Sequence, residues 1–267
     1  NIERAGKHYS KMYEIDSKCR KTALKYSSYL MQYDDADEAM TILDRIPVNA
    51  LARDEQVEVF WLQANYHARR HNYSESLHLL RKVLRFDPWN VSYLVQQVID
   101  LTYMTKVAEP ERYIDKFLYD ISATDESKID WEAYDRTTSA LQHLHHHELV
   151  YVRSKLRFLY SNGDDDTLME LIKSASEFDA SQGTYDLMRL LNTNFDSPTI
   201  YWALGILFKE LWQLETAAMW LEQVLLFADL SDPLRAKTLL ELSDCYIWGN
   251  RQLTKAIEYA KVAMDFG

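Results

Sequence analysis

Apolar residues spaced three and four positions apart recur along almost the whole chain. The segments 77–86 and 214–225 show this spacing most clearly. Residues at that spacing share one face of an α-helix, and such a face is normally buried against another element. No run alternates apolar and polar residues in the way of a half-buried strand. The sequence therefore predicts an all-α fold.

The scarcity of glycine and proline supports this prediction. The chain has 6 Gly and 5 Pro in 267 residues, which disfavours a turn-rich β-sandwich and the glycine loops of a nucleotide-binding α/β fold. Two of the prolines follow capping residues, in Ser197-Pro198 and Asp232-Pro233. An N-cap residue followed by a first-turn proline marks the start of a helix.

Two segments, 57–90 and 198–230, are internal repeats. A shift of 141 residues superposes their large and small side chains. The matched positions are Phe60 with Tyr201, Tyr73 with Leu214, Ser76 with Ala217, Leu80 with Leu221, and Val83 with Val224. A recurring helix–turn–helix unit indicates a repeat architecture, in which each unit buries its apolar face against its neighbours.

The repeats resemble the tetratricopeptide repeat (TPR), a helix–turn–helix unit of about 34 residues. The resemblance rests on Tyr201, Leu204, Gly205, Phe208, Ala217, Leu221 and Val224, which stand at the family's aromatic, small and large positions. It implies antiparallel helix pairs stacked into a right-handed α-solenoid. The small residues would let the two helices of a pair lie close together.

The remaining units follow the pattern less completely. Segments 20–53 and 235–267 are predicted to be further repeats, and 91–195 is predicted to hold degenerate helical repeats. Within that central part, the expected pairs are 91–106 with 110–119 and 149–162 with 167–178, and the expected extra helices are 131–148 and 185–191. No linker rich in Pro, Gly or Ser divides the chain. We therefore expect one superhelical domain over 1–267, with about seven helix pairs.

Charge and cysteine content limit the possible partners. The chain carries 30 Lys+Arg and 41 Asp+Glu, a net charge of −11, and the whole of the acidic excess lies after residue 90. Nucleic-acid binding favours a basic face, so a protein partner is expected instead. The basic start of the chain is either a solvated helix face or a surface for an acidic partner. Cys19 and Cys245 form neither a disulfide framework nor a zinc motif. They therefore do not indicate whether the protein works in an oxidising or a reducing compartment.

The sequence holds no signal peptide and no apolar run of the roughly 18 residues that a membrane span needs. It also lacks an initiator Met, and we expect it to be a piece of a longer protein or a processed chain. Targeting signals can then lie outside it. The cytoplasm is the first expectation for its location.

The histidine run is the most conspicuous candidate for chemistry. On one helix His143, His146 and His147 would share a face, a spacing that can bind Zn²⁺. No further ligand completes a known arrangement, so packing or solvent exposure is favoured over metal binding. A Gly-x-Ser-x-Gly motif and a glycine-rich phosphate loop are both absent. The chain is expected to be no enzyme and to need no cofactor; a metal-dependent or RNA-binding repeat stays as a lesser alternative.

The family resemblance implies a binding groove built from the first helices of the repeats. The residues expected to line it are Trp61, Asn65, Arg69, Trp202, Lys209 and Trp248. They offer aromatic anchors, an amide for a peptide backbone and cations for carboxylates. The sequence thus predicts an interaction module for a peptide or protein. The alternative is a scaffold segment of a larger assembly, such as a secretion or polysaccharide-export machine, with self-association through the end repeats.

Overall fold

The computed structural model describes residues 2–105, 107–120, 125–161, 163–191, 197–249 and 252–266. Within these ranges all regular structure is helical, with fourteen α-helices, four short 3-10 helices and no strand. The all-α prediction is confirmed. Lys106, Asn162 and residues 192–195 of the predicted central repeats, and 250, 251 and 267 of the last one, lie outside the described residues.

The chain divides into two compact units, Asn1–Ile129 and Asp130–Gly267. The expected continuation of one solenoid through both units stays a prediction.

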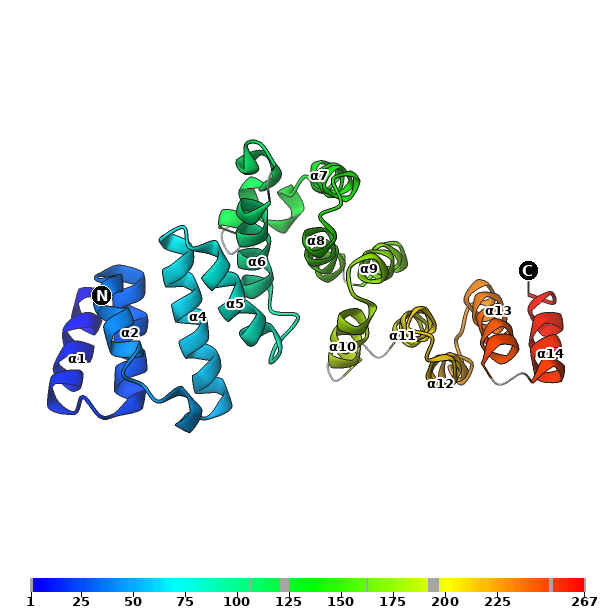
Figure 1. Ribbon diagram of the computed structural model, residues 1–267, viewed down its shortest axis with the longest axis horizontal. Helices are drawn as coiled ribbons and strands as arrows, with labels where there is room; N and C mark the ends of the chain where they lie inside the picture. Colours follow the sequence, from blue (N-terminus) through cyan, green and yellow to red (C-terminus); the bar gives the residue numbers. More distant parts are fainter. Residues whose placement is uncertain are drawn as a thin grey trace. The chain divides into compact units, whose positions relative to one another are not determined.

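The first unit consists of six α-helices and four 3-10 helices. The α-helices are α1 (Ile2–Ile15), α2 (Arg20–Tyr33), α3 (Ala36–Leu43), α4 (Arg53–Arg69), α5 (Tyr73–Leu84) and α6 (Val91–Met104). The 3-10 helices are η1 (Val48–Ala50), η2 (Pro110–Tyr113), η3 (Lys116–Tyr119) and η4 (Glu126–Lys128). Each α-helix packs on the next one along the chain, and α2 also lies against α4 (Figure 1). Packing of consecutive helices on their neighbours is the arrangement of a helical repeat array.

The core of the first unit lies between α2, α3 and α4. Leu24 and Leu30 of α2, Leu43 of α3 and Val59 of α4 are all buried there. At the N-terminus of α3 the Asp35 side chain accepts hydrogen bonds from two backbone N–H groups, which are otherwise unpaired at a helix start. Apolar spacing and capping thus produce the helices α2 and α3, which lie within the predicted repeat 20–53.

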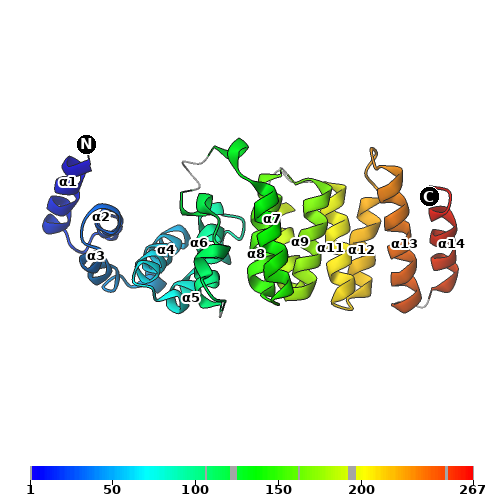
Figure 2. The same cartoon turned by 90° about the horizontal axis from the view of Figure 1, so that it is seen from above.

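The second unit consists of eight α-helices. They are α7 (Trp131–His143), α8 (His147–Tyr160), α9 (Asp165–Phe178), α10 (Ala180–Leu191), α11 (Pro198–Glu210), α12 (Leu214–Val224), α13 (Asp232–Trp248) and α14 (Leu253–Ala263). Figure 2 shows several of them side by side along the unit. Consecutive helices pack together, and α9, α11 and α13 also contact one another in turn. The segment 198–230 contains the helices α11 and α12, and the described part of 235–267 contains most of α13 and all of α14; their assignment as repeats stays a prediction.

Three helix pairs share the same turn. The pairs α4–α5, α7–α8 and α11–α12 are joined by three residues whose middle member, His71, His145 or Trp212, has a φ of 58°, 61° or 57°. In each turn the third residue donates its backbone N–H to a carbonyl five residues earlier, at 2.9 to 3.1 Å. This left-handed ending satisfies the last carbonyls of the first helix. His71 and Trp212 lie 141 residues apart, which is the repeat shift found in the sequence.

The shared turn corrects the prediction for 131–148. This segment is not one extra helix: the chain turns at His145, and α7 and α8 form a helix pair of their own. Tyr134 occupies the position of Phe60 and Tyr201 and is completely buried. The misassignment arose because His145 takes a left-handed conformation without a glycine to signal it.

A second correction concerns 110–119, which the sequence pattern predicts to be an α-helix paired with 91–106. It forms the two 3-10 helices η2 and η3, which pack on α6 in place of the expected second α-helix. Glu109, directly before Pro110, has a φ of 56°, a left-handed conformation that does not fit a continuous α-helix at this point. The expected helix 185–191 is the later part of α10.

None of the described helices is long and apolar enough to cross a membrane.

Candidate functional site

The first helices of the repeats line hollows in both units. In the first unit, a hollow of about 460 Å³ lies between α4 and α6, and we call it the α4–α6 hollow. Trp61, Asn65 and Arg69 form its α4 wall, one helical turn apart. The sequence prediction that these three side chains line one surface is consistent with this placement.

Aromatic rings form much of the α4–α6 hollow. The Trp61 ring packs against Tyr93 at 4.8 Å between centroids. Tyr73 of α5 and Tyr103 of α6 stack with centroids 4.6 Å apart and planes within 4° of parallel. Their packing fixes the ring positions, so a ligand would meet a preformed aromatic wall.

Polar groups of the hollow are partly held by the protein itself. Asn65 donates to the Trp61 carbonyl oxygen at 2.9 Å, and Arg69 donates through Nη1 to the Met31 carbonyl oxygen. On the α6 wall, Gln96 donates to Asp100 at 2.8 Å. These bonds orient the amide and guanidinium groups while leaving further donors for a ligand.

The predicted groove residues of the second unit have different surroundings. Trp202 is only 6% exposed, and its Nε1 is buried without a hydrogen-bond partner among the described residues. It lines a hollow of about 110 Å³ with Met169 and Lys237. Trp248, at the end of α13, is 69% exposed. Of these two tryptophans, only Trp248 offers a large surface to a partner.

Lys209 is bound within the protein. Its Nζ lies 2.5 Å from an oxygen of Glu241 and 2.8 Å from an oxygen of Asp244, both on α13. Burial opposes its positive charge, but the hydrogen bonds with Asp244 and Glu241 outweigh burial and raise the pKa of Lys209. Lys209 therefore joins α11 to α13, and a partner carboxylate would have to compete with two resident ones.

The histidine run does not share one helical face. His143 is the last residue of α7 and His146 is the N-cap of α8, with the left-handed His145 between them. The Nδ1 of His147 lies 3.5 Å from a Glu177 oxygen. No group of three His, Cys, Asp or Glu side chains in the described part of the chain is placed to hold a metal ion. The i, i+3, i+4 argument fails because it assumed a continuous helix.

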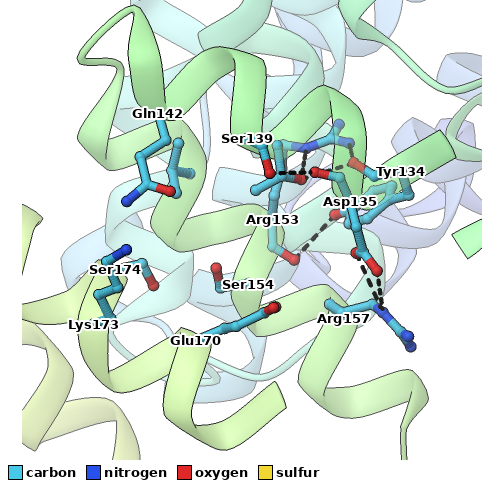
Figure 3. A pocket seen from close by; sticks show the side chains of 12 residues that line it. Tyr134, Asp135, Ser139, Gln142, Arg153, Ser154, Arg157, Glu170, Lys173 and Ser174 are labelled. Atoms are coloured by element: carbon cyan, nitrogen blue, oxygen red, sulfur yellow. Dashed lines mark hydrogen bonds and ion pairs between the residues drawn. The ribbon is translucent and has the colours of Figure 1, made fainter. Parts of the chain in front are cut away.

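A pocket of about 250 Å³ between α7, α8 and α9 was not foreseen from the sequence; we call it the α7–α9 pocket (Figure 3). Its walls are polar, with Asp135 on α7, Arg153, Ser154 and Arg157 on α8, and Glu170, Lys173 and Ser174 on α9. The signal was present: Arg153 and Lys155 interrupt the apolar run that begins at Leu149.

The buried Arg153 and the half-buried Arg157 form part of the floor of this pocket. The Arg153 side chain is completely buried, donates to the Tyr134 carbonyl at 2.9 Å and to the Thr138 hydroxyl at 2.8 Å, and lies 3.8 Å from the centre of the Tyr134 ring. Arg157 pairs with Asp135 at 3.4 Å and lies over the Trp131 ring. These contacts hold the α7 and α8 walls together.

No family model matches the chain, and no curated protein sequence matches it. Solved structures with similarity include the human IFIT1 dimer with m7Gppp-AAAA, at 14% identity and a TM-score of 0.32, covering 96% of this chain and 57% of that one. Another is Naa15/Naa10 bound to HypK-THB, at 15% identity and a TM-score of 0.35, covering 97% of this chain and 44% of that one. The chain thus spans less than two thirds of the length of each.

Proposed function

We propose that this chain is an interaction module that binds an extended peptide segment of a protein partner in the α4–α6 hollow. The observation that carries the proposal is the meeting of Trp61, Asn65 and Arg69 with the aromatic and amide side chains of α6. An aromatic anchor beside amide and guanidinium donors suits a peptide, because a peptide offers an apolar side chain and backbone carbonyls together. The net charge of −11 favours a protein over a nucleic acid as the partner.

A random peptide library selected on the whole chain would test this proposal. Enriched peptides are expected to bind Trp61→Ala at least about tenfold more weakly than wild type, because a buried aromatic anchor contributes about 2 kcal/mol. Arg69→Ala is expected to weaken binding further, but it also removes the bond to Met31, so its melting temperature must be measured alongside.

Trp212→Ala is the matched control, because Trp212 is an exposed tryptophan on the other unit. It should leave affinity unchanged. If folded Trp61→Ala binds the selected peptides as tightly as wild type does, the hollow is not the site. Independently of the peptide selection, capture from source lysate with wild type and the same variants would identify the biological partner.

A scaffold role is the second candidate, and α14 supplies the observation that favours it. Leu253, Ile257 and Met264 of the α14 region are all exposed, at positions that fall along one side of a helix. Exposed apolar residues grouped on an end helix favour association with another surface.

A further inference from the structure

We propose that the α7–α9 pocket binds a small zwitterion of the size of an α-amino acid, with Lys173 holding its carboxylate and Glu170 its ammonium group. The pocket lies in the second unit and is separate from the hollow proposed for peptides. Its volume of about 250 Å³ is below that of a typical drug-sized site and suits a ligand of that size.

The charged rim carries the proposal. Glu170 and Lys173 both line the pocket from α9, three residues apart, so they are neighbours on the same face. Within the described ranges, neither the Glu170 nor the Lys173 side chain takes part in a hydrogen bond or ion pair. The pocket therefore presents a carboxylate beside an ammonium group. A ligand that carries both a positive and a negative charge would pair with both groups at once.

The rest of the pocket agrees with a ligand of this kind. Burial, and next to it the nearby Asp135 carboxylate, raises the pKa of the Glu170 carboxyl, while Arg157 opposes the shift. A ligand ammonium group between the two carboxylates would relieve their repulsion. Asp135 itself is already paired with Arg157, which leaves Glu170 as the carboxylate open to a ligand.

The pocket floor supplies a polar contact for the body of the ligand. Ser154 is 6% exposed and lines the pocket from α8 (Figure 3). Its hydroxyl can donate a hydrogen bond to a bound carboxylate or accept one from a ligand ammonium group. Arg153, buried beside it, adds positive potential to the same floor.

Calorimetric titration of the whole chain with each of the twenty protein L-amino acids tests this inference. At least one is expected to bind saturably, and its affinity is expected to fall at least about tenfold in Lys173→Gln and in Glu170→Gln, because each removes a charge-assisted bond. The N-acetyl and C-amide forms of the same amino acid should each bind at least about tenfold more weakly, since each lacks one charge.

Glu258→Gln and Lys261→Gln are the matched controls, because these residues stand three apart on α14 outside the pocket. They should leave the affinity unchanged, and circular dichroism should show all variants folded. Absence of binding across the panel would overturn the proposal. Binding that persists in both pocket variants, or equal binding of acetate or methylamine alone, would overturn it too.

Discussion

At the scale of single residues, two buried carboxylates are accommodated in different ways. Asp186 lies 2.6 Å from the buried ammonium of Lys155 and 2.8 Å from the Tyr151 hydroxyl. Among the described residues, Asp100 accepts hydrogen bonds only from Ser76 and Gln96, both neutral, and burial raises its pKa to about 6 against those bonds. Asp186 is a compensated charge, whereas Asp100 destabilises the folded state when it ionises.

Asp100→Asn is therefore expected to stabilise the protein at neutral pH. The folded pKa lies above the unfolded value of 3.8, so the contribution of the protonated form to stability is complete below that value and is lost as the pH rises through about 6. The variant, which has no such charge, should gain up to about 3 kcal/mol at pH 7.5 and less at pH 5.

Urea unfolding at the two pH values measures this difference. Asp186→Asn is the matched control: it breaks the pair with Lys155 and should lose stability at both. Equal stability of wild type and Asp100→Asn at pH 7.5 would show that burying the ionised Asp100 carboxylate does not destabilise the folded protein.

At the scale of elements, close approach of paired helices depends on small residues. A Cβ added to Gly205 of α11 would lie 2.6 Å from the Leu221 side chain of α12, which is completely buried. The resemblance to the TPR placed Gly205 at a small position for this packing reason, and the structure agrees. The turns between helices were harder to predict, because His71, His145 and Trp212 take a left-handed conformation that the sequence does not mark.

Gly205→Ala is expected to destabilise the second unit by about 1–2 kcal/mol, because overpacking outweighs the gain in helix propensity. In a Leu221→Ala background the added methyl group has room, and the same substitution should become neutral or stabilising. Thermal unfolding of the four proteins in this cycle gives the coupling between the two positions. A stabilising effect of Gly205→Ala alone would show that α11 and α12 can separate without cost.

At the scale of the whole molecule, exposed apolar residues on α14 bear on the scaffold role. If the end helix mediates association, sedimentation velocity should show larger species as protein concentration rises. Leu253→Glu together with Ile257→Glu should restore a monomer, whereas Met12→Glu on α1 should not. A wild-type chain that stays monomeric at high concentration would argue against self-association through α14.

The helices and the two strongest repeats could be predicted from the amino-acid pattern alone. Apolar spacing and capping act within one helix or between neighbouring helices, so the repeats 57–90 and 198–230 can be predicted from the sequence. The same holds for the alignment of Trp61, Asn65 and Arg69 along one side of a helix. Which polar groups already have partners could be seen only in the folded protein. Lys209 is paired across helices, Trp202 is buried, and Glu170, Lys173 and Ser154 meet in one pocket, because such contacts depend on how separate helices approach one another rather than on spacing along one of them.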